Sequence, residues 1–517
     1  MKTLKILISS LALMTVLSSP LQAQITSISM MNPPDRWTDS KAFAPKAVAA
    51  FYQARNGAPV WGNDETFQAL RQALARLEKH GLQSAEYHFA ALLYFQDNPE
   101  ARERYATDAW LSAAAHMVYG KLNPKTYEPD WTAAGRKADL AAILAQALKD
   151  GSVANSLEAL APKQAGYQAL LKEHEILRAE AREAVTTIPV GAALKIKMTG
   201  PRVTALQTRL LELGLIDETQ ISGIFDAVTE VAVKTFQIQQ DLDSDGVAGA
   251  ATIAALVRGP EIKLNQLRVN LERWRWLPDD LGRRHVRANI AGFNLTTWEN
   301  GQPVRTHLTI IGKAFRKTPV FSDEIEYTVF NPWWETPPSL ARADKLPAFQ
   351  RDPGAVERLG FQVLDKSGKV IDPSTIDWKA ISAANMPYRL RQKPGPLNAL
   401  GQVKIIFPNV HNVYFHDTPT RDLFAQRQRA FSSGCMRTQD PIELSKWLLA
   451  ETPEWTSERI DAAVASGKET RATLSQKVPV HVLYFTVVSE DDGRVRYLDD
   501  VYARDSAVLT GLGTFAH

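Results

Sequence analysis

The chain has 517 residues, of which 45% are hydrophobic and 23% charged, and its formal net charge is +3. This apolar content supports several packed domains of about 150 residues each and excludes a disordered chain. The sequence contains no basic run, so its composition gives no indication of nucleic-acid binding.

The amino terminus, residues 1–23, has the pattern of a secretory signal peptide. Lys2 and Lys5 precede an apolar run from Ile6 to Leu17, and small residues lead to an expected cleavage point after Ala23. The run is shorter than the roughly 20 residues that cross a bilayer comfortably. We therefore predict a soluble exported protein. The alternative is that the signal is not cleaved and anchors the protein in the membrane.

The chain has a single cysteine, Cys435. Exported proteins usually meet an oxidising compartment in which cysteines pair, yet this thiol has no possible internal partner. Two interpretations are open at this point: a small buried hydrophobic side chain, or a thiol kept for its reactivity.

Residues 24–190 are predicted to form a helical scaffold domain. Alanine and leucine are frequent there, and apolar side chains recur at helical spacing, as at Phe67, Leu70, Leu74 and Leu77. The histidines lack ligand spacing and are interpreted as structural: His80, His88, His116 and His174. The stretch from Thr186 to Gly191 breaks the helical pattern and marks a boundary.

A three-helix unit is predicted over residues 195–258. One helix runs from Arg202 to Leu213, a second ends near Gln237, and a turn at Asp245-Gly246 precedes a short third helix. Four strings resemble the peptidoglycan-binding module of cell-wall enzymes: Val203-Thr-Ala-Leu-Gln, Gly223-Ile-Phe-Asp, Ala232-Val-Lys-Thr-Phe-Gln, and Asp245-Gly-Val-Ala-Gly with Thr252. Most are core and turn positions, so wall binding and a purely positioning role both stay open.

After a helical connector over residues 259–283, the pattern changes to strands through residues 284–505. Alternating segments predict a mainly β domain, a curled sheet or sandwich: His285–Ile290, Phe293–Trp298, Val304–Ile311, Glu326–Phe330, Val403–Phe407, Val413–His416 and Val480–Val488. A parallel α/β fold is disfavoured because helices do not alternate regularly with these strands.

Two neighbouring segments carry the candidate chemistry. On the strand Val413–His416, Tyr414 and His416 face the same side. Cys435 follows in a Ser-Ser-Gly turn just before a predicted helix with Asp440 as N-cap, Pro441 at its first position and Glu443 completing a capping box.

A cysteine nucleophile requires such surroundings. An imidazolium at His416 would lower the pKa of the thiol, and His416 would then carry the proton. Gly434 and Ser433 would shape a loop whose amides, including that of Cys435, face a developing oxyanion. Arg437 would either bind a substrate carboxylate or hold the loop.

The strings His416-Asp-Thr and Ser432-Ser-Gly-Cys-Met-Arg resemble the signature of the YkuD-type L,D-transpeptidase domain. Two further strings, Asn331-Pro-Trp-Trp-Glu-Thr-Pro-Pro and Pro394-Gly-Pro-Leu-Asn-Ala-Leu-Gly, are similar to segments of its large YcbB-like branch. Many shorter relatives have a histidine where this chain has Ser433, which leaves His416 as the well-placed base.

The resemblance implies a periplasmic enzyme of peptidoglycan biosynthesis that needs no cofactor or metal. Cys435 would form a thioester with a tetrapeptide stem and release D-alanine, and an amine on a second stem would complete a 3-3 cross-link. Carbapenems would acylate the same thiol, and other cell-wall synthases are conceivable partners. The acceptor stays open, since hydrolysis or attachment of a protein would use the same residues.

Rival functions are less consistent with the sequence. A metal hydrolase built on His411, His416 and Asp417 is disfavoured because odd spacing would put the histidines on opposite faces of a strand. A papain-like peptidase would usually place its cysteine before its histidine. A non-catalytic wall-binding scaffold would not need the pairing of Cys435 with His416.

Residues 335–393 interrupt the strand pattern and predict an inserted subdomain between stiff or aromatic flanks, Trp333-Trp334 and Pro394-Gly-Pro396. The resemblance to the YcbB-like branch implies that this insert caps the substrate groove. Trp334 is the candidate for a groove wall, with a buried core position as the alternative.

Overall fold

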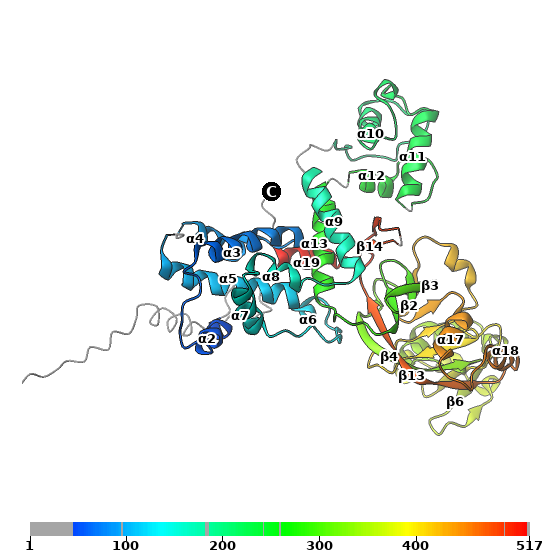
Figure 1. Cartoon of the computed structure of the whole chain (residues 1–517). Helices are drawn as coiled ribbons and strands as arrows, with labels where there is room; N and C mark the ends of the chain where they lie inside the picture. The colour runs from blue at the N-terminus through cyan, green and yellow to red at the C-terminus, as the bar shows by residue number, and fades with distance from the viewer. Residues whose placement is uncertain are drawn as a thin grey trace, which may run out of the picture. The chain divides into compact units, whose positions relative to one another are not determined.

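A computed structural model describes residues 45–94, 97–180, 186–240, 242–257, 260–490 and 492–513, so the predicted signal peptide lies outside the described residues. These residues form two compact units: 45–122 with 137–162, and 123–136 with 163–513. The chain is multidomain, with a helical amino-terminal region, a small helical module and a mainly β domain (Figure 1). Among the described helices, none is both long and apolar enough to cross a membrane.

The first unit is helical. Its α-helices are α2 (Pro45–Gln53), α3 (Asp64–Arg76), α4 (Phe89–Tyr94), α5 (Pro99–Tyr119), α7 (Leu140–Asp150) and α8 (Val153–Ser156). The side chain of Asn63 caps α3 by accepting a hydrogen bond from the amide of Thr66. The four apolar residues predicted to share one face, Phe67, Leu70, Leu74 and Leu77, are all buried.

The histidines of this unit have structural partners, as predicted. His88 Nε2 lies 2.8 Å from Asp108 Oδ2, and His116 Nδ1 lies 2.9 Å from the Tyr87 hydroxyl. His80 Nε2 lies 3.8 Å from Glu158 Oε1. The first two contacts satisfy polar atoms of His88 and His116 by hydrogen bonding, and the third is at ion-pair distance only.

The helical module contains α10 (Pro201–Glu212), α11 (Ala227–Gln239) and α12 (Ala250–Leu256) around one apolar core. Two buried glutamines hold its turns in the same way. Gln207 Oε1 accepts the Gly223 amide at 2.8 Å, and Gln237 Oε1 accepts the Gly246 amide at 2.9 Å. Both glycines have a positive φ, which favours glycine there. The residues behind the resemblance are therefore core and turn positions.

Two helices flank this module in sequence and pack on each other: α9 (Ala165–Glu180) and α13 (Pro260–Arg275). Gly166 leaves room for the Trp274 ring, because a Cβ there would lie only 2.4 Å from it. The buried Arg275 pairs with Glu272 at 2.8 Å and bonds the Tyr167 hydroxyl at 3.4 Å. The module thus occupies the chain between two helices that contact each other.

The mainly β domain is built on a curled sheet. Its strands are β1 (Arg284–Asn289), β2 (Asn294–Glu299), β3 (Gln302–Gly312), β4 (Phe321–Phe330), β9 (Val403–Ile406), β10 (Phe415–His416), β11 (Ala430–Ser432), β12 (Met436–Thr438) and β13 (Thr470–Leu483). Their order is β11-β3-β12-β10-β9-β4-β13-β1-β2, and a further pairing of β2 with β3 closes the sheet into a ring. The predicted curled sheet is confirmed.

Both predicted boundaries of the last long strand were wrong, and β4 begins five residues before the predicted Glu326. The last strand was expected over Val480–Val488, but β13 begins at Thr470, and a register shift between Thr473 and Val478 hides its alternation. It ends at Leu483, because Thr486 then donates its amide to Asn270 of α13 at 2.9 Å. A separate hairpin follows, formed by β14 (Val487–Ser489) and β15 (Val495–Tyr497).

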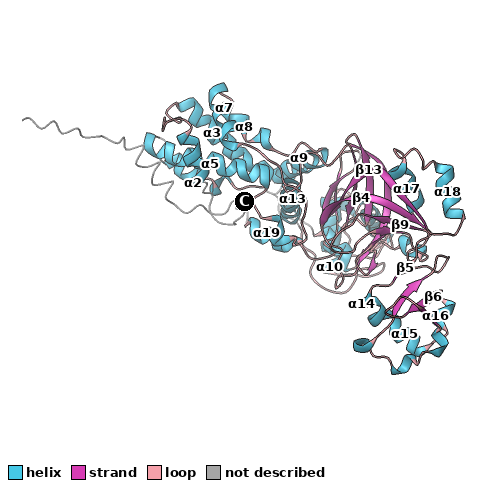
Figure 2. Cartoon of the chain, turned by 90° about the horizontal axis from the view of Figure 1, so that it is seen from below, coloured by secondary structure: helices cyan, strands magenta, loops and turns pink. Residues whose placement is uncertain are grey.

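The predicted insert has its own sheet, of order β5-β8-β6-β7. Its strands are β5 (Trp334–Glu335), β6 (Phe361–Leu364), β7 (Val370–Ile371) and β8 (Arg389–Gln392). Short helices α14 (Pro338–Leu340), α15 (Leu346–Arg351) and α16 (Ala355–Arg358) lie beside it, with a π-helical turn over Ala341–Lys345 (Figure 2). Phe349, Phe361 and Trp378 form the centre of a separate core, so the insert is a subdomain rather than an irregular loop.

The remaining helices of the second unit are α6 (Pro124–Tyr127), α17 (Pro441–Leu449), α18 (Ser457–Ala465) and α19 (Asp505–Leu512). Asp440 precedes α17 and Pro441 begins it, as predicted. The predicted capping box is wrong: Asp440 has a φ of +47° and its side chain makes no cap. Its carboxylate pairs instead with Arg305 at 3.2 Å, and Glu443 approaches the same guanidinium at 3.7 Å.

Candidate active site

Strand register gathers the candidate side chains on one face of the sheet. His416 of β10 pairs with Lys404 of β9 on one side and with Arg437 of β12 on the other. One position earlier, the amide of Met436 donates to the carbonyl of Tyr414 at 3.2 Å. Side chains two positions apart on a strand face the same side. Tyr414 therefore faces the same side as His416, and Cys435 the same side as Arg437.

A cavity of about 1010 Å³ opens over this face. Its lining includes Lys404, Tyr414, His416, Cys435 and Arg437 from the sheet, Arg316 and Lys317 from the β3–β4 loop, and Trp334, Asp344 and Lys345 from the insert. Sequence reasoning named five of these residues and missed Lys404. The alternation of Val403–Phe407 would have placed that lysine among apolar neighbours, an unusual position for a charge.

The strand that carries His416 is shorter than predicted. β10 begins at Phe415 because the Asn409 side chain bonds the amide of Val413 at 3.2 Å and its carbonyl at 2.7 Å, which turns residues 409–413. His411 therefore lies in a turn, not on the opposite face of a strand. Its Nδ1 is 3.8 Å from Asp130 Oδ1. In the part of the chain that the structure describes, no group of three His, Cys, Asp or Glu side chains is placed to hold a metal ion.

The loop before the thiol is fixed by hydroxyl groups. Ser432 Oγ donates to the Cys435 carbonyl at 2.5 Å and accepts the Gly434 amide at 3.1 Å, and Thr318 Oγ1 donates to the Gly434 carbonyl at 2.9 Å. Gly434 has a φ of +121°, which a residue with a Cβ rarely adopts. The Gly434 amide is engaged, whereas the amide of Cys435 has no hydrogen-bond partner among the described residues.

Ser433 lines the cavity and is held by the β3–β4 loop. Its side chain is exposed and accepts a hydrogen bond from Arg316 Nη1 at 2.9 Å. The same guanidinium reaches Asp344 of the insert at 3.2 Å. Arg316 thus connects the loop that carries the thiol to the insert.

The charges next to the thiol are not those expected from the sequence. Burial raises the pKa of Cys435, while hydrogen bonds from Tyr414 and the positive charges of Lys404 and Arg437 lower it. The thiol itself lies 3.6 Å from the Asn412 carbonyl.

His416 is a neutral imidazole. It is 6% exposed, and its Nδ1 lies 2.5 Å from the carbonyl of Asp417; since a carbonyl only accepts, Nδ1 carries the hydrogen and Nε2 keeps its lone pair. Burial lowers the pKa of His416 to about 3, and the charges of Arg437 and Lys404 act in the same direction. The expected imidazolium is therefore absent in the resting site, and no direct hydrogen bond joins His416 to Cys435 among the described residues.

Both interpretations of Trp334 hold. Its ring packs edge-on against Phe361 at 6.0 Å in the core of the insert, and it also lines the cavity. Lys345 lies over the same ring, 5.4 Å from its centroid. Burial, together with Cys435, raises the pKa of the Tyr414 hydroxyl, whereas hydrogen bonding with Trp334 lowers it. Trp334 therefore connects the insert to the residue beside the thiol.

Arg437 is half-buried and only lightly engaged. Its Nη1 donates to Thr420 Oγ1 at 3.1 Å, and no carboxylate of the described residues lies within ion-pair distance of it. A buried cation without an anion is costly. This arrangement favours an anionic group in the cavity.

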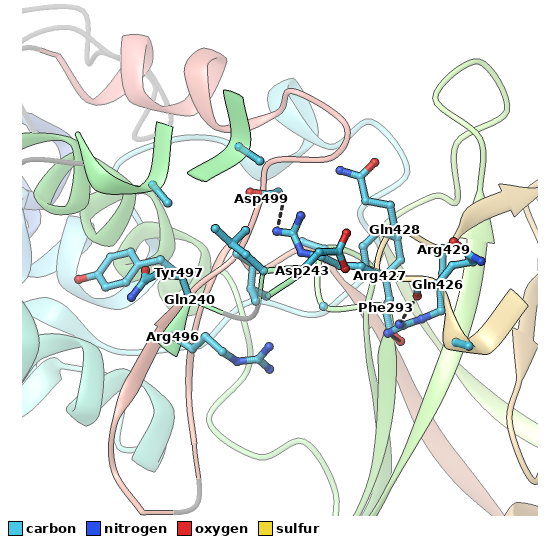
Figure 3. A pocket seen from close by; sticks show the side chains of 17 residues that line it. Gln240, Asp243, Phe293, Gln426, Arg427, Gln428, Arg429, Arg496, Tyr497 and Asp499 are labelled. Atoms are coloured by element: carbon cyan, nitrogen blue, oxygen red, sulfur yellow. Dashed lines mark hydrogen bonds and ion pairs between the residues drawn. The ribbon is translucent and has the colours of Figure 1, made fainter. Parts of the chain in front are cut away.

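A second, smaller pocket has a different character. It measures about 300 Å³, and Figure 3 shows Arg427 on its lining joined to Asp499. Arg427 pairs with Asp499 at 3.0 Å, and Arg429 donates to the Gln426 carbonyl at 2.8 Å. Its lining contains no thiol and no histidine, so the larger cavity is the candidate active site.

Comparisons with known proteins agree with this assignment. Three family models match the chain: "Scaffold domain" over residues 46–173, "Putative peptidoglycan binding domain" over residues 199–256, and the YkuD model, "L,D-transpeptidase catalytic domain", over residues 283–470. The last range contains every candidate catalytic residue.

A curated relative from Haemophilus influenzae, "Putative L,D-transpeptidase", is 35% identical over 243 residues. The match covers 47% of this chain and 48% of the relative, so the chain spans about half the length of that protein.

Solved structures of two L,D-transpeptidases also align with the chain. One, from Xylanimonas cellulosilytica, is 17% identical with a TM-score of 0.17, and covers 57% of this chain and 99% of its own. The other, from Stackebrandtia nassauensis, is 14% identical with a TM-score of 0.20, and covers 58% and 97%.

Proposed function

We propose that this chain, which carries the L,D-transpeptidase catalytic domain of the YkuD family together with a peptidoglycan-binding domain, cross-links peptidoglycan through a thioester on Cys435. The observation that carries the proposal is the register of β9, β10 and β12. It places the thiol and a neutral imidazole on one face of one cavity, inside the matched catalytic domain.

In the first half-reaction, Cys435 attacks the carbonyl after the third residue of a tetrapeptide stem. His416 Nε2 takes the thiol proton and passes it to the departing amine of D-alanine, leaving the thioester. The amide of Cys435 supports the proposed oxyanion, a contribution of about 2.7 to 4 kcal/mol for one such donor in known enzymes.

In the second half-reaction, an acceptor amine replaces D-alanine. His416 removes a proton as the amine, typically the side-chain amine of diaminopimelate on another stem, attacks the thioester. The product is a 3-3 cross-link and the thiol is regenerated. In both half-reactions the proton is transferred by His416. Peptidoglycan as substrate implies that the enzyme works outside the cytoplasm, in the periplasm.

The test is muropeptide analysis after expression of the wild type and of Cys435→Ala. New 3-3 dimers are expected with the wild type alone. On purified protein, a carbapenem should give a mass adduct on the wild type and none on Cys435→Ala, since the sequence has no other cysteine. An adduct on the variant, or dimers formed by it, would refute the assignment.

Hydrolysis of the same thioester is the second candidate function. The cavity is large enough to admit water beside a stem, and the proposed residues would serve a carboxypeptidase equally well. The muropeptide experiment separates the two: shortened tripeptide stems without dimers would identify the hydrolase. A non-catalytic scaffold would produce neither.

A further inference from the structure

Two cations flank the thiol on the same face of the sheet. Lys404 and Arg437 are the two register neighbours of His416, one from β9 and one from β12. Both are half-buried, and neither has a carboxylate within ion-pair distance among the residues described. Because a partly buried cation without a counter-ion is costly, such a pair indicates that an anion forms between them during the reaction.

Lys404 is held in a defined place. Its ammonium lies 4.2 Å from the centroid of the Tyr414 ring, a favourable cation–π distance. Tyr414 lies beside Cys435 in the strand register. The Lys404 ammonium therefore lies close to the residue next to the thiol, and Lys404 is also the register neighbour of His416. Lysine here is therefore part of the cavity wall and not a surface charge.

One carboxylate, Glu469, acts on the Lys404 ammonium from beyond ion-pair distance, and it accepts the Trp333 amide at 2.8 Å. The other cations around the cavity are engaged by partners of their own. From the β3–β4 loop, Arg316 pairs with Asp344 and Lys317 donates to the Tyr502 carbonyl at 3.0 Å. From the insert, Lys345 lies over Trp334, 5.4 Å away. Lys404 and Arg437 are the cations that remain to face Tyr414, His416 and Cys435.

We propose that Lys404 is a positioning residue for the nucleophile, whose ammonium stabilises the Cys435 thiolate as the proton moves to His416. The inference rests on the proposed role of Cys435 and adds a residue to it. The S–H bond breaks, the proton goes to Nε2 of His416, and the electron pair on sulfur faces the ammonium until it attacks the carbonyl.

Removal of the positive charge of Lys404 should change the pKa of the Cys435 thiol. An opposite charge near a thiolate lowers its pKa, so neutralising Lys404 should raise the pKa of Cys435 by about one unit. The same substitution removes a repulsion from His416 and should raise the pKa of that imidazole as well. A lysine that merely binds a substrate carboxylate would change neither in the free enzyme.

The sole cysteine makes the test direct, since alkylation by iodoacetamide against pH reports on Cys435 alone. We expect Lys404→Met to slow alkylation at neutral pH about tenfold, which is one unit of pKa, and Lys404→Arg to restore most of the rate. Lys477→Met is the matched control, because it removes an exposed lysine that pairs with Glu326 at 2.7 Å away from the cavity; it should leave the profile unchanged.

A wild-type alkylation midpoint in Lys404→Met would overturn the proposal, even if turnover fell, because the defect would then lie in substrate binding. If circular dichroism shows that Lys404→Met does not fold, Lys404→Gln supplies the neutral variant under the same criterion. The titration uses no stem peptide. It therefore stands apart from the proposed function, which the muropeptides of Cys435→Ala test independently.

Discussion

At the scale of single residues, the site works with uncharged partners at rest. Burial keeps His416 neutral and raises the pKa of Cys435, while Lys404 and Arg437 supply the positive charge. The sequence motifs pointed to Cys435 as the candidate nucleophile and His416 as the candidate base, and they led us to expect the positive charge on the imidazole. The two strands were predicted one after the other, but their register was not, and it is the register that places Lys404 beside His416.

The neutral imidazole predicts an unusual dependence on acid. With a pKa of about 3, His416 remains a base well below neutrality, so acylation by a carbapenem should change less than about twofold between pH 7 and pH 5. A histidine at the ordinary value of about 6.5 would be about 97% protonated at pH 5 and would lose most of the rate. Stopped-flow measurement of acylation across this range decides between them.

Replacing the base should change the form of the same profile. In His416→Ala the thiol persists, but only its ionised fraction reacts, so the rate should drop by about a hundredfold or more near neutrality and then rise about tenfold per pH unit. Wild-type rates in this variant would mean that the base lies elsewhere.

At the scale of elements, side-chain contacts connect the insert to the loop that carries Cys435. Arg316 bonds Ser433 beside the thiol and Asp344 of the insert, and Trp334 belongs to the insert's core while lining the cavity. The sequence predicted an inserted subdomain from its prolines and turns. It did not reveal the four-stranded sheet, because β5 and β7 have only two residues each and leave no periodicity to detect.

Replacing residues 336–393 by a short glycine linker should raise the ratio of thioester hydrolysis to cross-linking, or abolish donor binding. The reason is that a cover over the cavity excludes water that competes with the amine. Muropeptide products of the two proteins give the ratio. An unchanged rate and product ratio in a folded variant would show that the insert is not a lid.

A smaller change tests the same connection. Asp344→Asn removes the ion pair with Arg316 and should shift the product ratio towards hydrolysis by about twofold. Asp352→Asn is the matched control, since Asp352 pairs with Arg358 within the insert and does not line the cavity. Equal ratios in the two variants would contradict a role for the Arg316 contact.

At the scale of the whole molecule, the helical module is an insertion between α9 and α13, which pack on each other without it. Deleting residues 186–257 with a short linker should therefore leave carbapenem acylation unchanged and reduce co-sedimentation with purified peptidoglycan. If sedimentation persists at the wild-type level, the module positions the enzyme without binding the wall. The sequence predicted the three helices closely, because their core and turn residues all lie within one short segment of the chain.

Acid should also weaken the fold. Burial lowers the pKa of His285 to about 4 and of His416 to about 3, and it lowers that of His307 and His481 as well. The unfolded chain titrates near 6.5 and so binds more protons below that pH, which means that the free energy of unfolding falls as pH drops from about 6.5 towards 3. Guanidinium unfolding at pH 7.5 and pH 5 should show a lower midpoint in acid. Equal midpoints would contradict this prediction.

The place of β13 in the ring has a consequence for the order of assembly. This strand separates β4 from β1, yet residues 470–483 are synthesised after both Cys435 and His416. During synthesis from the amino terminus, Cys435 and His416 are therefore present for an interval in which the ring is still open. The ring can close only after residues 470–483 have been synthesised. A nascent or prematurely terminated chain would therefore expose the Cys435 thiol without a complete site around it.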